Sequence, residues 1–193
     1  VLKKEHNAVS NLIKIVNQFK EVQIEADVSV LSIDIQKALP HLCNAIDMIT
    51  RIFLRQQHES LPAHYDDIMD GKDEERKKFY ELFKGPFNPL TDYKSEFGDV
   101  NDRRKGCAFY PDTLEDCRII DKIELLDEED KKLAKDHYTI IRDMEVGLEI
   151  IPYHIYYASE LGEIFDELEI AADLIENEEL STYLINKAEA LIS

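Results

Sequence analysis

Apolar residues recur at spacings of three and four along most of this 193-residue chain, and this restricts it to a mainly α fold. The longest run begins at Pro152, which suits the first turn of a helix, and Asn177 interrupts it before the pattern resumes to residue 191. A second run starts after Ser32, a candidate N-cap, and extends to Phe53. Pro40 either starts the main body of that helix or kinks it.

Three shorter helical signals complete the pattern. Residues 1–22 place Val9, Leu12, Ile13, Val16 and Phe19 on one helical face. Residues 61–84 predict two short helices on either side of Asp70-Gly71. Asp112 reads as the cap of a further helix, with Glu115 as its capping-box partner.

Two other segments are not helical in pattern. Residues 85–105 are rich in Gly, Pro, Asn and Asp, with aromatic residues between them, which predicts a long ordered loop. Residues 138–142 and 148–151 predict the one convincing strand pair, a small β-hairpin with its turn near residues 145–147. We therefore expect one helical lobe over residues 1–193. It comprises a leading helix at 1–23, helices and loop at 24–105, and hairpin and C-terminal helices at 106–193.

The charge of the chain limits its partners. With 41 Asp and Glu against 23 Lys and Arg, the net charge of -18 repels phosphate backbones and anionic lipids, so we expect neither nucleic acid nor membrane as a partner. Solubility accounts for such a surface, and a field that steers a cationic peptide amino terminus is the alternative. No apolar run approaches the ~20 residues that span a bilayer. We expect a soluble protein and favour the cytoplasm.

The sequence offers no metal site and no catalytic residue. His58 and His64 flank Glu59, but they lie six residues apart, about 600° of helical rotation, and Pro62 interrupts the segment. A solvent-exposed loop is the simpler interpretation. The three cysteines form no zinc-knuckle spacing, and no nucleophile elbow, phosphate loop or dinucleotide motif occurs. We therefore expect no cofactor in this segment.

Aromatic residues are the best candidates for binding. Tyr110, Tyr153, Tyr156 and Tyr157 are possible substrate-cleft residues, because a tyrosine combines a flat apolar face with a hydroxyl that can reach a peptide backbone. Phe109 and Tyr138 belong to the same aromatic set. Packing in the core is the alternative for all of them.

Several separated segments, in the same order, resemble the N-terminal half of the dipeptidyl-peptidase-III-like zinc peptidases, particularly the shorter bacterial members. Residues 26–32 are similar to their Ala-Asp-Leu-Ser-His-Leu-Ser, and residues 52–56 to their Ile-Phe-Trp-x-Gln. Residues 85–90 resemble Gly-Pro-Trp-Asp-Arg-Leu, and residues 109–111 resemble the start of a Phe-Tyr-Pro-Ala-Asp helix entry. Further similar segments cover residues 138–142, 151–153 and 183–191.

This chain also departs from the family pattern at four positions. Phe87, Asn88 and Pro89 replace Trp, Asp and Arg, and Ala108 replaces the Asn that precedes Phe-Tyr-Pro. If those family positions contact substrate, the departures affect the specificity or the activity of this protein.

The resemblance implies a two-lobed enzyme that releases dipeptides from peptide N-termini. It implies that zinc is held in a C-terminal lobe by a His-Glu-x-x-Gly-His or His-Glu-x-x-x-His helix with a further Glu. That lobe is absent from these 193 residues, so we expect this segment to be inactive alone, with the catalytic lobe and a peptide substrate as its partners. One alternative is a non-catalytic helical protein-interaction module derived from that lobe. The other is an unrelated helical structural protein, which should lack both the hairpin and the long loop.

Overall fold

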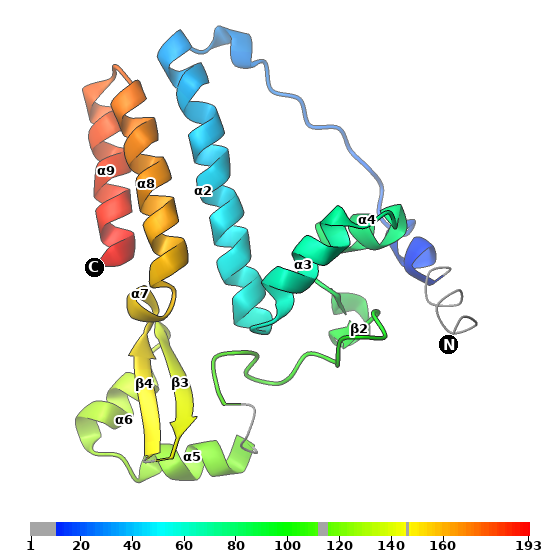
Figure 1. Cartoon of the computed structure of the whole chain (residues 1–193), viewed down its shortest axis with the longest axis vertical. Coiled ribbons are helices and arrows are strands. Elements are labelled where there is room, and N and C mark those ends of the chain that lie inside the picture. The colour runs from blue at the N-terminus through cyan, green and yellow to red at the C-terminus, as the bar shows by residue number, and fades with distance from the viewer. Residues whose placement is uncertain (1–10, 112–115, 146) are drawn as a thin grey trace. The chain divides into compact units, whose positions relative to one another are not determined.

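The computed structural model describes residues 11–111, 116–145 and 147–193, and it confirms a mainly α fold (Figure 1). Two small antiparallel sheets accompany the helices in these residues. In chain order the elements are η1 (Val28–Val30), α2 (Ile33–Gln57), α3 (Leu61–Asp70), α4 (Glu74–Phe83), β1 (Phe87–Asn88), η2 (Pro89–Thr91), β2 (Lys94–Ser95), α5 (Asp116–Glu124), α6 (Glu128–Ala134), β3 (Thr139–Met144), β4 (Gly147–Pro152), α7 (Tyr153–Tyr156), α8 (Ala158–Leu174) and α9 (Glu178–Ile192).

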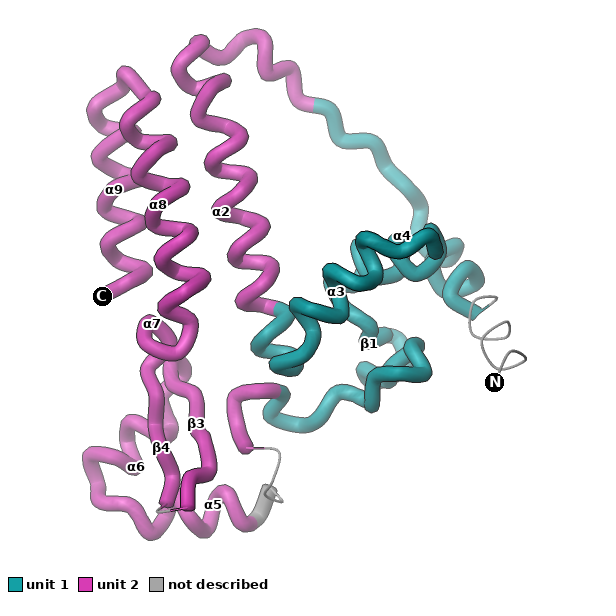
Figure 2. Tube along the Cα trace, in the orientation of Figure 1, with its two compact units in different colours: residues 1–25, 54–107 teal, residues 26–53, 108–193 magenta. Residues whose placement is uncertain are grey.

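The chain divides into two compact units, shown in different colours in Figure 2. Unit 1 comprises residues 1–25 and 54–107, and unit 2 comprises residues 26–53 and 108–193. The boundary at residues 53 and 54 lies inside α2, so one helix contributes to both units. The expectation of one lobe over residues 1–193 stays a prediction.

Unit 1 is built around an aromatic core. Phe79, Tyr80, Phe87 and Phe97 are buried together with Leu54 at the end of α2. The two short helices form where the sequence predicts them, with Pro62 in the first turn of α3. Asp73 caps α4 by accepting hydrogen bonds from the backbone N–H groups of Glu75 and Arg76, which have no partner inside the helix. These helices therefore owe their ends to local chemistry and their positions to the shared core.

The leading helix ends earlier than its pattern predicts. Within residues 11–22, residues 11–16 are helical, whereas the predicted helix extends to residue 22. Leu12 and Ile15 are buried and hold this helix in the core of unit 1. The next apolar residues after Phe19, Val22 and Ile24, are 69% and 91% exposed and lie outside that core. Without tertiary packing, so short a helical segment is not stable.

The long loop of unit 1 is ordered, as its composition predicts. Its anchor is Asn88, which is 1% exposed. The side-chain oxygen of Asn88 accepts a hydrogen bond from Leu90 N at 2.9 Å, and its amide nitrogen donates to Glu96 Oε1 at 2.8 Å. The two-residue strands β1 and β2 pair in the same loop. The sequence did not predict this pair, because two residues are too few to show a period.

Three helices form one end of unit 2. A three-residue connection joins α8 to α9, so the two helices lie antiparallel, with α2 beside α8 (Figure 1). Ala38 of α2 and Ala171 and Ala172 of α8 are buried in one cluster, and such small side chains let helices approach closely. Asn177, predicted as an interruption, is the N-cap of α9 and accepts a hydrogen bond from Leu180 N.

The hairpin of β3 and β4 forms the other part of unit 2, where the sequence predicts it. The strands pair from Thr139 opposite Pro152 to Met144 opposite Gly147. Ile119 and Ile123 of α5 and Ala134 of α6 are buried against Ile141 of β3. The predicted helix start at Asp112 and Glu115 lies outside the described residues, and α5 is described from residue 116.

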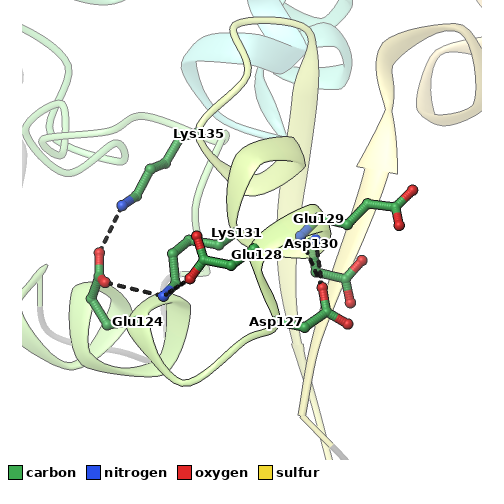
Figure 3. Close-up of polar contacts among 7 residues, drawn as sticks. All are labelled: Glu124, Asp127, Glu128, Glu129, Asp130, Lys131 and Lys135. Carbon is green, nitrogen blue, oxygen red and sulfur yellow. Dashed lines mark hydrogen bonds and ion pairs between the residues drawn. The ribbon is translucent and has the colours of Figure 1, made fainter.

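Helices α5 and α6 are linked by ion pairs (Figure 3). Glu124 of α5 contacts Lys131 of α6 at 3.4 Å and Lys135 at 2.7 Å. Asp127 caps α6 by accepting from the backbone N–H groups of Glu129 and Asp130. Exposed ion pairs of this kind each contribute little to stability. The apolar contacts with β3 therefore hold the two helices in place, and the ion pairs add to the orientation of α6 against α5.

Across the part of the chain that the structure describes, we find no helix that is long and apolar enough to span a membrane.

The ordered loop of unit 1 gives a first prediction. Asn88→Ala should lower the free energy of unfolding by about 1–3 kcal/mol, because it removes two hydrogen bonds and leaves Leu90 N without its side-chain acceptor. Urea unfolding followed by circular dichroism measures this change. Asn101→Ala, at an exposed loop position, is the control and should change the free energy by less than about 0.5 kcal/mol. Equal effects of the two variants would contradict the role of Asn88.

Candidate functional site

The predicted cleft residues lie where the hairpin of unit 2 meets α7. Tyr138 precedes β3 and Tyr153 follows β4, and Tyr153 N donates a hydrogen bond to Tyr138 O at 2.9 Å. On the other edge of β3, Ile141 N donates to Phe109 O at 2.8 Å. Strand pairing therefore brings together three aromatic segments that are far apart in the sequence.

The aromatic residues of these segments form one group, which we call the tyrosine cluster: Phe109, Tyr110, Tyr138, Tyr153, Tyr156 and Tyr157. Tyr110 joins it at the margin, because its ring packs against the apolar core of α5, α6 and β3 while its phenol affects Tyr153. The ring of Tyr153 stacks on Phe109 at a centroid distance of 6.1 Å and an interplanar angle of 7°. Tyr138 and Tyr157 meet Tyr153 edge to face, at 5.9 Å and 5.4 Å. These distances lie in the range where aromatic pairs attract, so Tyr153 is the centre of the cluster.

Arg142 of β3 supports the cluster from the strand. Its guanidinium donates to Tyr156 Oη at 2.5 Å and to the backbone oxygens of Ala108 and Ile141, each at 2.9 Å. The guanidinium carbon Cζ of Arg142 also lies 4.6 Å from the centre of the Tyr156 ring. A hydrogen bond from a charged donor is stronger than one between neutral groups, so Arg142 fixes the orientation of Tyr156.

The solvent exposure of the cluster members increases from Tyr157 in the core to Tyr138 at the surface. Tyr157 is 1% exposed and belongs to a buried cluster with Ala45, Leu161 and Ile164. Tyr110, Tyr153 and Tyr156 are half-buried, and Tyr138 is 72% exposed. Any contact with a substrate would therefore fall to the half-buried rings and to Tyr138, with Tyr157 as packing beneath them.

Burial changes the chemistry of the central tyrosine. Burial raises the pKa of the Tyr153 phenol, and the neighbouring Tyr110 and Tyr138 phenols raise it further. Tyr153 therefore stays a neutral hydroxyl that can donate a hydrogen bond across the physiological range.

The histidines are engaged in local contacts. His58 Nδ1 lies 2.9 Å from Ser60 Oγ. His64 Nδ1 lies 2.8 Å from Tyr80 Oη, and its Nε2 lies 3.4 Å from a carboxylate oxygen of Asp99. Within residues 11–111, 116–145 and 147–193, no three His, Cys, Asp or Glu side chains are grouped so that they could hold a metal ion.

Sequence patterns alone miss two members of the site. They indicate only that Arg142 lies in a strand, and they do not separate Tyr138 from the wider aromatic set. The strand period placed Arg142 in the hairpin but carried no sign of which rings it would meet. The contacts of Arg142 depend on residues 108 and 109, which lie along the edge of β3 that does not pair with β4.

Comparison with known proteins now shows what the fold resembles. No family model matches the chain. No curated protein sequence matches it. The solved dipeptidyl-peptidase III from Corallococcus sp. strain EGB is similar, with a TM-score of 0.85 and 26% identity over 95% of this chain and 35% of that chain. The solved dipeptidyl-peptidase III from Caldithrix abyssi is also similar, with a TM-score of 0.81 and 27% identity. That match covers 93% of this chain and 34% of the Caldithrix chain.

The chain thus has the fold of a domain found in solved peptidases. More particularly, it has the fold of part of bacterial dipeptidyl-peptidase III, and the resemblance drawn from the sequence is confirmed. It spans about a third of the length of these two solved chains. The β3–β4 hairpin and the long loop are both present, which argues against an unrelated helical bundle.

Tyr153 gives a prediction on pH. Because its pKa in the folded state is raised, its contribution to stability is present below the unfolded value of about 10 and is lost as pH rises through the folded value. The difference between the ultraviolet titration curves of the wild type and the Tyr153→Phe variant should show one phenol that ionises above pH ~10. Tyr183→Phe, which removes an exposed phenol on α9, is the control. A Tyr153 midpoint at or below about 10 would contradict the packed cluster.

Proposed function

We propose that this chain is the substrate-cleft lobe of a zinc-dependent peptidase that releases dipeptides from peptide N-termini, and that it is inactive without the rest of the enzyme. The similarity to dipeptidyl-peptidase III over 95% of this chain carries the proposal. Because the chain spans only 35% of that structure, the proposal includes a C-terminal catalytic lobe elsewhere in the full protein.

The proposal assigns zinc to that C-terminal lobe, where it would polarise the scissile carbonyl and activate water. The described residues support this assignment because they bring together no set of metal ligands. The role left for this chain is to bind and position the peptide. Placement of the enzyme in the cytoplasm stays a prediction.

The tyrosine cluster fits a role in peptide binding. Its half-buried rings offer flat apolar faces to substrate side chains, and their hydroxyls can reach a peptide backbone. Arg142 holds Tyr156 in one orientation, which reduces the entropy lost when a substrate binds. The cluster therefore supplies contact and orientation, and it supplies no nucleophile or base.

The charge of unit 2 fits a peptide amino terminus. Residues 26–53 and 108–193 contain 26 Asp and Glu against nine Lys and Arg, whereas unit 1 contains 15 against 14. Nearly all of the net charge of -18 thus belongs to the unit that carries the tyrosine cluster. Such a field attracts a positively charged ammonium group at low salt.

A non-catalytic helical interaction module is the second candidate. Exposed apolar residues on the helices of unit 2, such as Ile46 at 59% and Tyr183 at 54%, favour it because they offer a binding surface without any need for catalysis. A missing catalytic lobe would leave apolar residues exposed as well. The two candidates therefore differ in whether the full protein binds zinc and cleaves peptides.

The isolated chain should be catalytically silent. We expect purified residues 1–193 to bind less than one zinc per molecule after dialysis and to release no product from a dipeptidyl fluorogenic substrate. Elemental analysis and a fluorescence assay measure the two properties. Stoichiometric zinc or hydrolysis by this chain, retained in the double variant His58→Ala/His64→Ala, would place a metal centre on other residues of the chain. Loss of both properties in that variant would place it on the two histidines.

The tyrosine cluster predicts a defect in substrate binding. In the protein from the complete coding sequence, Tyr153→Phe should raise KM by about fivefold, equivalent to ~1 kcal/mol, because the hydroxyl is lost while the ring packing is kept. Steady-state kinetics measures this change. Tyr183→Phe on α9, outside the cluster, should leave KM unchanged. A KM for Tyr153→Phe equal to that of wild type would remove the hydroxyl from the binding site.

A further inference from the structure

Helix α2 has one apolar face that is packed within unit 2. Ala38 and Ala45 are 0% and 3% exposed. Ala38 is buried in a cluster with Ala171 of α8, and Ala45 in a cluster with Leu161 and Ile164 of the same helix. This face accounts for how α2 is held in its unit.

The apolar face of α2 continues past this packed strip to side chains that are exposed. Ile46, Ile49 and Phe53 are 59%, 51% and 40% exposed. Their spacing of three and four residues places them along one side of the helix, and we call them the α2 stripe. Single exposed apolar side chains are common, but aligned neighbours on one helix form a patch of the kind that marks an interface.

The α2 stripe also lies in the neutral part of an acidic unit. Residues 33–53 of α2 contain two acidic and two basic side chains. Residues 158–193, which comprise α8, α9 and the connection between them, contain ten acidic side chains and one lysine. The core of a stable protein interface is depleted in charged residues. The α2 stripe therefore differs from the exposed apolar residues of α9, which lie among carboxylates.

The lengths of the related structures indicate what covers this stripe. About two thirds of each dipeptidyl-peptidase III chain lies outside the part that this chain matches, since the match covers 35% and 34% of them. A second copy of this chain is a poor occupant, because two molecules of charge -18 repel each other. A neutral apolar stripe fits a permanent contact with a segment of the same protein.

We infer that the α2 stripe is the surface on which the remaining part of the longer protein packs. This inference rests on the proposed function, since it requires a further lobe. It makes Ile46, Ile49 and Phe53 interface residues that stabilise the complete enzyme, and it gives them no part in substrate binding.

The test compares the double variant Ile46→Gln/Ile49→Gln in two settings. Glutamine keeps the helix propensity but removes the apolar surface. In residues 1–193 alone, the variant should shift Tm by less than about 2 °C, because both side chains are already exposed. In the protein from the complete coding sequence, it should lower the Tm of the cooperative transition by about 5 °C or more. Tyr183→Gln, at an exposed position of α9, is the matched control and should shift neither.

Three results would overturn the inference. The first is an equally small shift of Tm in the complete protein. The second is a large shift in residues 1–193 alone, which would mean that the stripe is buried within this chain. The third is a dimer of residues 1–193 that the double variant dissociates, seen by light scattering, which would make a second copy the occupant. A complete protein without zinc-dependent peptidase activity would count against the proposed function, whereas these Tm and mass measurements judge the stripe independently.

Discussion

The antiparallel pairing of β3 with β4 is the constraint on which the candidate site depends. It places the start of β3 opposite the end of β4, so that Tyr138 and Tyr153 meet through a backbone hydrogen bond and an edge-to-face ring contact. The free edge of β3 then receives Phe109, whose ring stacks on Tyr153. Because side chains alternate along a strand, a shift of one residue in this pairing would separate the rings and turn Arg142 away from Tyr156. The site is therefore a product of strand register.

Sequence reasoning succeeded where a local pattern sufficed. The period of α2, the breaks beside Gly71 and Asn177, and the two strands of the hairpin are all indicated by neighbouring residues, and the structure confirms them. It failed where packing decides the outcome. Residues 17–22 continue a helical pattern, but Phe19 contacts only the edge of the core through Phe83 and Val22 is 69% exposed. The two-residue strands β1 and β2 are too short to show a period. The graded exposure of the tyrosines likewise depends on α8, which lies far along the chain from Phe109.

The two units differ in what they would supply to the proposed peptide-binding role. Unit 1 is nearly neutral and is organised by aromatic packing and by the buried amide of Asn88. Unit 2 combines the acidic excess, the tyrosine cluster and the neutral α2 stripe. An acidic field acts over a distance and an aromatic face acts on contact, so together they would first attract a peptide amino terminus and then position the chain behind it. A stripe without charge is suited to a different task, the permanent attachment of another part of the protein.

Our account places the catalytic metal outside these 193 residues, and reading the coding sequence beyond Ser193 tests that claim most directly. The account predicts that translation continues into a second lobe that contains a His-Glu-x-x-Gly-His or His-Glu-x-x-x-His helix and a further Glu. A stop codon immediately after Ser193, or a continuation without any such helix, would contradict it.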